Sequence, residues 1–143
     1  MMSVLSKVAG DIEAVLQEDM LDSDSPEKRL TVFMNIVFNV VKKNREYYQV
    51  NMDFWTQINQ KDKVRKVIAS HYGKFRETAQ NVIDEGIAKG DFKKVNSSEY
   101  AAYIIAVIDG LSLQFLFDTD SFDYDQVVKN SSVIILSGLR SDV

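Results

Sequence analysis

The feature that most constrains this fold is one uninterrupted helical repeat between Asp62 and Lys89. Apolar residues recur there at alternating spacings of three and four residues, which places them in one stripe along a helix with charges on the other side. At about 1.5 Å per residue the helix is roughly 40 Å long, so other helices must pack along it. Gly90 follows, and glycine readily adopts the left-handed conformation that ends a helix. The stripe consists of Val64, Val67, Ile68, His71, Tyr72, Phe75, Thr78, Ala79, Val82, Ile83, Gly86 and Ile87.

Helix signals recur along the rest of the chain. Ser25 precedes a proline at a first helical position, and Asn96 and Asp123 stand where capping residues belong. Gly10 lies inside the first predicted helix, where it costs about 1 kcal/mol relative to alanine. The predicted helices span about 3–21, 26–43, 45–60, 62–89, 97–117 and 124–139.

The length and composition predict a single all-α domain. A chain of 143 residues is long enough to bury one core. One proline and six glycines favour long helices over many strands and turns. We find no internal repeat or linker. We therefore expect one domain over residues 1–143, with about six helices in an orthogonal or antiparallel bundle.

Composition also excludes several classes of function. The net charge of −4 and the pI near 5.0 make the chain by itself a poor binder of nucleic-acid backbones. It has one histidine, no cysteine, no glycine-rich phosphate loop and no nucleophile elbow. No uninterrupted apolar run approaches the ~20 residues that cross a bilayer. We expect no enzymatic activity, cofactor, metal or membrane partner, and the lack of cysteine is compatible with the cytoplasm.

The last two predicted helices are apolar on more than one side. One core covers only one stripe of each helix, and soluble monomers rarely expose a large apolar patch. The same helix pair from a second copy would cover the other side and form a two-fold four-helix bundle. The alternative is that a single chain buries both helices. The predicted dimer-interface residues are Ile105, Ile108, Leu113, Val128, Ile135 and Leu139.

A set of aromatic and methionine residues predicts an apolar cavity with a few polar groups. Ordinary core packing is the alternative for each of them, and His71 is either a core histidine satisfied by one hydrogen bond or a ligand contact. Because few ionisable groups are expected to face inward, we expect a largely apolar or aromatic effector. The predicted ligand-binding residues are Phe33, Met34, Val37, Met52, Trp55, His71, Tyr72, Phe75, Tyr103 and Val107.

The segment 82–118 resembles the C-terminal, ligand-binding half of TetR-type transcriptional regulators. That family often shows an "EGxxxGxF" helix end, a short loop, a helix ending in "DGLxLQ" and an acidic break. The resemblance is close over about 54–120, whereas before it only helix number and lengths agree. The matching residues here are Glu85, Gly86, Gly90, Phe92, Asp109, Gly110, Leu111, Leu113, Gln114 and Asp118.

The resemblance implies a homodimer built by the last two helices, with a small-molecule site in each protomer. In such bacterial repressors the effector modulates DNA binding by an N-terminal helix-turn-helix domain. Nothing in this chain resembles that domain, so DNA would be contacted only through a domain not present here. The alternative is a stand-alone helical module that dimerises or binds small molecules without touching DNA.

Overall fold

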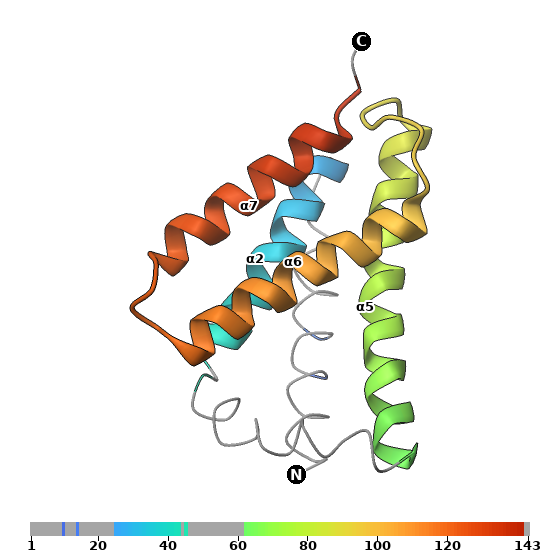
Figure 1. Cartoon of the computed structure of the whole chain (residues 1–143). Coiled ribbons are helices and arrows are strands. Elements are labelled where there is room, and N and C mark those ends of the chain that lie inside the picture. The colour runs from blue at the N-terminus through green and yellow to red at the C-terminus, as the bar shows by residue number, and fades with distance from the viewer. Residues whose placement is uncertain (1–9, 11–13, 15–24, 44, 46–61, 142–143) are drawn as a thin grey trace.

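The computed structural model describes residues 10, 14, 25–43, 45 and 62–141 (Figure 1). These residues form an all-α fold, as predicted, with no strand among them and one isolated β-bridge between Phe92 and Arg140. The predicted helices over 3–21 and 45–60 lie almost entirely outside the described residues, so the number six stays a prediction. The four long helices are α2 (Pro26–Lys43), α5 (Asp62–Ala88), α6 (Ser97–Phe117) and α7 (Tyr124–Leu139).

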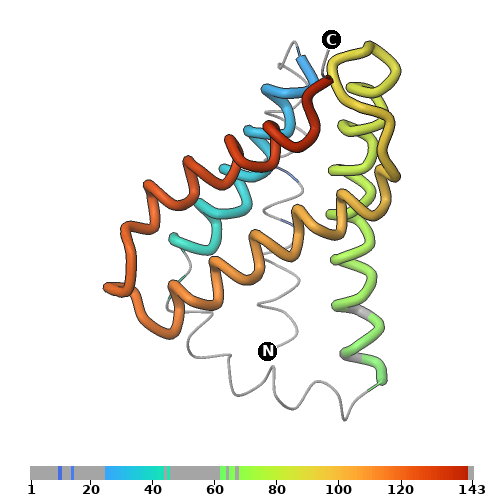
Figure 2. The backbone as a smooth tube through the Cα atoms, turned by 45° about the horizontal axis from the view of Figure 1, so that its top comes forward, coloured from blue at the N-terminus to red at the C-terminus, as the bar shows by residue number. Residues whose placement is uncertain are grey.

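The helices are arranged around α2. α6 and α7 form an antiparallel hairpin in front of α2, and α5 runs along one side (Figures 1 and 2). α6 crosses the C-terminal half of α5, and the two helices diverge from that crossing. By length and composition alone, α6 could cross a membrane, which the search for uninterrupted apolar runs did not anticipate. The core helix of a soluble protein meets the same criterion, and one side of α6 belongs to the core.

The predicted helix starts are confirmed by their capping hydrogen bonds. The side chain of Asn96 accepts from the backbone N–H of Glu99 at 3.2 Å, and that of Asp123 from Gln126 at 3.2 Å. The hydroxyl of Ser25 accepts from the backbone N–H three residues later. These bonds satisfy donors that have no partner within the helix. Because the signals are local, the sequence predicted the boundaries within one residue.

The end of α5 is fixed by Gly90, which has a φ of 82°. The N–H of Gly90 donates to the carbonyl of Ile87 at 3.1 Å, and the N–H of Asp91 donates to the carbonyl of Gly86 at 2.9 Å. This pair of bonds is the Schellman motif, in which a left-handed residue closes the last turn. The predicted helix stop is therefore confirmed, with its physical cause.

The ring of Phe92 lies directly on the backbone of Gly86. A Cβ atom at position 86 would be 2.1 Å from Cδ2 of Phe92, so only glycine fits without displacing the ring. Phe92 itself is buried. The next residue, Lys93, donates its backbone N–H to the carbonyl of Leu139 at 2.8 Å. The loop after α5 thus joins the end of α5 to the end of α7.

The core lies where α2, the C-terminal half of α5 and the inner side of α6 meet. Its members are almost all aliphatic or aromatic, and burying each large one contributes about 1.5–3 kcal/mol. Tyr124 is the polar exception, with its hydroxyl donating to the carbonyl of Phe38 at 3.3 Å. The core residues are Leu30, Phe33, Met34, Val37, Phe38, Ala79, Val82, Ile83, Phe92, Ala101, Ile104, Ile105, Ile108, Phe115, Tyr124, Leu136 and Leu139.

Ion pairs connect α2 to its neighbours at the rim of this core. They join α2 to α5 once and to the α7 segment twice. Each is partly exposed to solvent, where such a pair contributes about 0.2–1 kcal/mol. They orient α2 more than they stabilise it. The pairs are Arg29–Glu85, Lys42–Asp125 (2.8 Å) and Glu27–Arg140 (2.6 Å).

Two glycines of α5 give a matched test of this packing. We expect Gly86→Ala to lower the free energy of unfolding by about 1–3 kcal/mol, because the added methyl group displaces the ring of Phe92. An added Cβ at Gly73 meets nothing within 4 Å, so Gly73→Ala should raise the stability by about 0.5–1 kcal/mol through helix propensity. Urea unfolding of both variants measures the difference. Equal effects of the two substitutions would contradict the assigned packing of Phe92.

Candidate effector-binding region

The burial of the inward stripe changes along α5. In the C-terminal half, Ala79, Val82 and Ile83 are at most 1% exposed. In the N-terminal half, the inward residues whose burial is described are only half-buried, and it is here that α5 diverges from α6 (Figure 1). The tight core therefore covers only part of α5. The half-buried residues, which we call the α5 inner segment, are Ile68, His71, Tyr72 and Phe75.

Tyr72 connects the α5 inner segment to α6 through its influence on Asp109. The carboxylate of Asp109 is half-buried on α6. Burial raises the pKa of Asp109 above its ordinary value, and the hydrogen bond from Tyr72 acts in the opposite direction. A carboxylate has about four lone-pair positions, so it can accept further donors. The arrangement can therefore bind a cation or a hydrogen-bond donor.

His71 precedes Tyr72 on the same segment. Both of its ring nitrogens are buried, and neither has a hydrogen-bond partner in the part of the chain that the structure describes. A neutral imidazole needs one donor and one acceptor, and an unpaired buried polar group costs about 1–3 kcal/mol. Native proteins rarely leave such groups unpaired. The two ring nitrogens of His71 therefore mark a polar position within the α5 inner segment.

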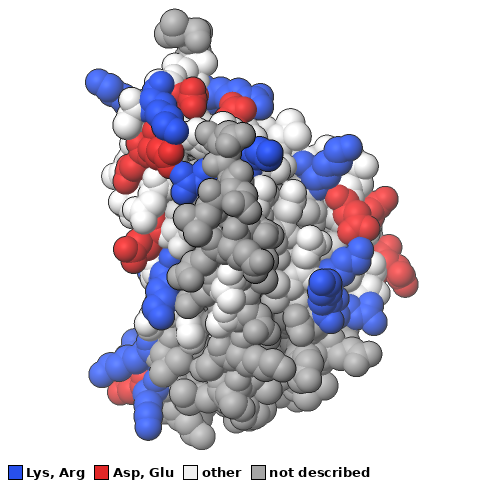
Figure 3. All heavy atoms as spheres, turned by 180° about the vertical axis from the view of Figure 1, so that it is seen from behind, with Lys and Arg blue, Asp and Glu red and all other residues white. Residues whose placement is uncertain are grey.

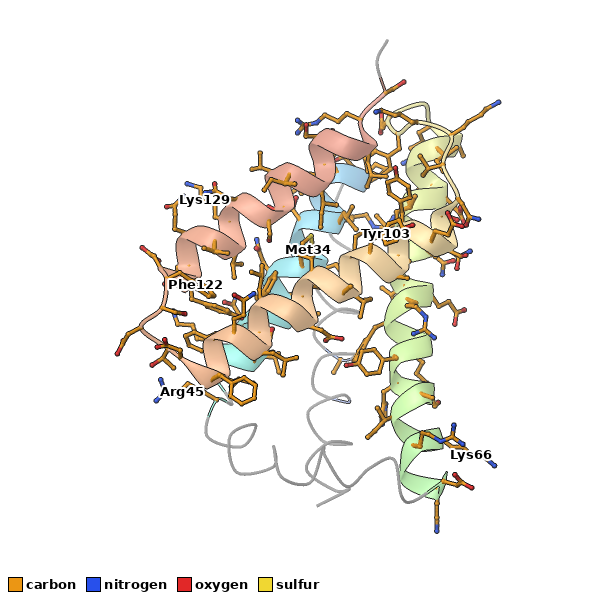
Figure 4. All side chains as sticks on the ribbon, viewed as in Figure 1. Met34, Arg45, Lys66, Tyr103, Phe122 and Lys129 are labelled. Carbon is orange, nitrogen blue, oxygen red and sulfur yellow. The ribbon has the colours of Figure 1, made fainter. Side chains whose placement is uncertain are left out.

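The structure distributes the predicted ligand-binding residues among three environments. Phe33, Met34 and Val37 of α2 are buried in the core. His71, Tyr72, Phe75 and Val107 are half-buried. Tyr103 is 59% exposed on α6 and packs edge-on against Tyr100, so it does not face the interior of the chain (Figure 4). The predicted residues Met52 and Trp55 lie outside the described residues.

Asp109 was not predicted from the sequence as a binding residue and was noted only as part of a family motif. Few ionisable groups were expected to face inward. Between Tyr100 and Phe117, Asp109 is the only charged residue in α6. A single acid in so apolar a segment was the available signal, because burying a carboxylate without a function is costly.

A hollow lies between α2 and α7. It has a volume of about 410 Å³ and is open to solvent, and many of its lining side chains are polar, including Asn35, Asn39 and Ser132. Such a groove does not enclose an apolar ligand. Groups of three or more potential metal ligands do not occur among the described residues.

The face of α6 and α7 that points away from α2 is apolar and exposed. On α6, Tyr103, Leu113 and Phe117 lie in one stripe with the small residues Ala106 and Gly110, at helical spacings of three and four. We call these residues, together with Ile134 of α7, the outward stripe. The exposed fractions of its large members are 59% for Tyr103, 49% for Leu113, 75% for Phe117 and 70% for Ile134.

Several predicted dimer-interface residues are not part of the outward stripe. Ile105, Ile108 and Leu139 are buried in the core of the single chain, so their side chains are not on its surface. Val128 and Ile135 are half-buried, and Leu113 is exposed. The reason is that α6 is apolar around most of its circumference. Spacing alone then does not reveal which apolar side faces the core.

The opposite face of the molecule has a different character. Basic and acidic side chains are interspersed along both of its edges, and neither sign gathers into a patch among the described residues (Figure 3). Gripping a phosphate backbone requires a concentration of positive charge. The described residues of this face show no such concentration (Figure 3).

These features define a class of protein: an all-α domain with an exposed apolar helical hairpin and with Tyr72 and Asp109 beside its core. Comparison with known proteins gives the same class. Residues 26–133, more than half of the chain, match the C-terminal domain of BetI-type transcriptional repressors. The chain belongs to this family, within the TetR-type regulators, as its sequence predicted. No curated protein sequence matches the chain.

Solved structures show the same fold. A transcriptional regulator from Saccharomonospora viridis, in complex with choline, has a TM-score of 0.85 and 18% identity, over 98% of this chain and 73% of that one. A TetR regulator from Haloarcula marismortui has a TM-score of 0.84 and 16% identity, over 97% and 76%. FadR from Bacillus subtilis, in complex with stearoyl-CoA, has a TM-score of 0.78 and 16% identity, over 96% and 73%.

Removing the charge of Asp109 should stabilise the domain in the absence of ligand. Its raised pKa means that the charged form is disfavoured in the folded state, so this cost is present at neutral pH and disappears as the carboxyl protonates. We expect Asp109→Asn, which keeps an acceptor for Tyr72, to have a higher melting temperature at pH 7. The advantage should shrink as the pH falls towards about 4. Thermal unfolding at both pH values checks this, and a less stable variant at pH 7 would contradict it.

Proposed function

We propose that this domain is the effector-sensing and dimerisation part of a TetR-type transcriptional repressor. The observation that carries the proposal is that two sides of α6 present different features. One side presents the outward stripe, and another holds Asp109 beside the half-buried segment of α5. One helix thus carries both a surface for a second copy and a polar group for a ligand.

The outward stripe supports dimerisation. Only 39% of the most apolar 18-residue window of α6 is buried inside the chain, so much of its apolar surface is uncovered. Pairing α6 and α7 with the same helices of a second copy would bury this surface in a four-helix bundle with two-fold symmetry. The small residues Ala106 and Gly110 would let the two α6 helices approach closely, and an added Cβ at Gly110 meets nothing within 4 Å in the single chain.

The α5 inner segment supports effector binding. Its half-buried apolar side chains, with Val107 of α6, offer apolar contact for a small and largely apolar ligand. The structures from S. viridis and B. subtilis were solved with choline and with stearoyl-CoA, so domains of this fold hold ligands of different chemistry. The contributions of Met52 and Trp55 to this site stay a prediction.

In the whole regulator, the effector would act on a helix-turn-helix domain through this domain. Operator half-sites lie about 34–36 Å apart, so a small tilt of one protomer against the other changes the fit to DNA. The ligand shifts the balance of the two arrangements only by its differential affinity for them, typically about 1–3 kcal/mol. We propose that the regulator works in the cytoplasm.

A charge placed on the outward stripe tests the dimer. Ile134→Glu should convert a dimer into a folded monomer, because Ile134 is 70% exposed in the single chain and becomes buried only on pairing. Asn81→Glu adds the same charge to an exposed position on α5 and should leave the dimer intact. Light scattering after gel filtration gives the mass, and circular dichroism confirms folding. A dimeric mass for Ile134→Glu, or a monomeric mass for the wild type, would contradict the proposed pairing.

A further inference from the structure

The groove between α2 and α7 has one wall made of three polar side chains from successive turns of α2. Thr31, Asn35 and Asn39 follow one another at intervals of four residues, and all three line the groove. Residues at this spacing lie above one another on one face of a helix. Asparagine is one of the poorer residues for a helix interior, so helix stability does not account for this row.

The side-chain amides of Asn35 and Asn39 are available for a ligand. Neither forms a hydrogen bond with another of the residues that the structure describes. By contrast, the hydroxyls of Thr31 and Ser132, which also line the groove, donate to backbone carbonyls of their own helices. An amide offers both donors and an acceptor. Each asparagine can therefore pair with one backbone N–H and one backbone C=O of a ligand.

The spacing of the two amides matches an extended peptide. Four residues of an α-helix rise by about 6 Å, and two residues of an extended chain rise by about 6.6–6.8 Å. Alternate residues of an extended chain direct their backbone N–H and C=O groups to the same side. A segment lying along α2 could therefore bond to Asn35 through one residue and to Asn39 through the next residue but one.

The α7 side of the groove is suited to the side chains of such a segment. The groove volume of about 410 Å³ is within the range of binding sites in proteins, about 300–1,000 Å³. Successive side chains of an extended chain point to opposite faces, so every second one could contact the apolar residues of α7 while the backbone pairs with α2. These apolar residues are Val128, Val133 and Leu136.

Lys129 gives the groove a positive charge that lacks a counter-charge. The other two charged residues of the lining, Asp125 and Arg140, form ion pairs with residues of α2. Lys129 has no such partner among the described residues, and it projects from the edge of α7 that faces away from α6 (Figure 4). Complementary charges favour one partner over another, so an acidic side chain fits this position and a basic one does not.

We propose that this groove binds an extended segment of a partner protein, with an acidic side chain for Lys129 between apolar side chains for α7. Asn35 and Asn39 hold the backbone of the segment, and Lys129 selects its charge. None of the lining residues belongs to the outward stripe or to the α5 inner segment. The partner could therefore bind while a second copy and an effector occupy those surfaces.

Three acetylated pentapeptide amides test the backbone and the charge separately: Thr-Val-Glu-Val-Thr, Thr-Val-Lys-Val-Thr, and the glutamate peptide with both valines N-methylated. The side-chain amide signals of Asn35 and Asn39 in heteronuclear NMR spectra of the intact domain report binding. We expect the glutamate peptide to shift both signals. It should bind at least about fivefold more tightly than either of the others, because they lose the charge pair or two backbone donors.

Two substitutions assign the contributions to residues. Asn35→Ala should weaken the binding of both unmethylated peptides about tenfold, whereas Lys129→Gln should remove the preference for glutamate over lysine. Asn130→Ala and Lys94→Gln change exposed residues outside the groove and are the matched controls. Both controls should leave the affinities unchanged.

Unshifted signals of Asn35 and Asn39 with the glutamate peptide at millimolar concentration would overturn the groove as a peptide site. Equal affinities of the three peptides, or equal losses in Asn35→Ala and Asn130→Ala, would overturn the assigned contacts. A fall in dimer mass on addition of the peptide would show that a second copy occupies the groove, which would also overturn the inference. Since the peptides are compared on the wild-type domain, this comparison does not depend on the folding of a variant.

Discussion

The structure depends on a helix that is apolar around most of its circumference, although the chain covers only one side of it. The inner residues of α6, such as Ile104 and Ile108, pack with α2 and α5 and complete the core. The outward stripe remains exposed on the other side. The hydrophobic effect scales with the apolar area removed from water, so the same property that builds the core would also favour the association that we propose. Under that proposal, fold and assembly are two consequences of one sequence feature.

Asp109 lies next to the outward stripe, so the proposed ligand position and the proposed interface are close together on α6. Asp109 is followed directly by Gly110, which lies in the outward stripe. A ligand held at Asp109 would therefore contact the same turn of α6 that meets a second copy. Packed helices move as rigid elements between discrete arrangements, so a shift of this turn would change how two copies sit together.

Local signals made the helices predictable, whereas side-chain environments depended on tertiary packing. Asn96, Asp123 and Gly90 determine helix ends through hydrogen bonds within a few residues, and all of these were read correctly from the sequence. The direction of an apolar side chain on α6 has no such local determinant. The burial of Ile108, the exposure of Tyr103 and the half-buried position of Asp109 in the single chain were therefore not predicted, because each depends on where α5 crosses α6.

A cysteine cross-linking experiment tests the pairing of α6 with its copy most directly, because the chain contains no native cysteine. Single cysteines would be placed at Ala106, Gly110 and Leu113 of the outward stripe, and at the exposed Asn81 of α5 as a reference. We expect mild oxidation to give a disulfide-linked dimer from at least one stripe position and none from position 81. Cross-linking that is absent from all three stripe positions, or as efficient at position 81, would contradict it.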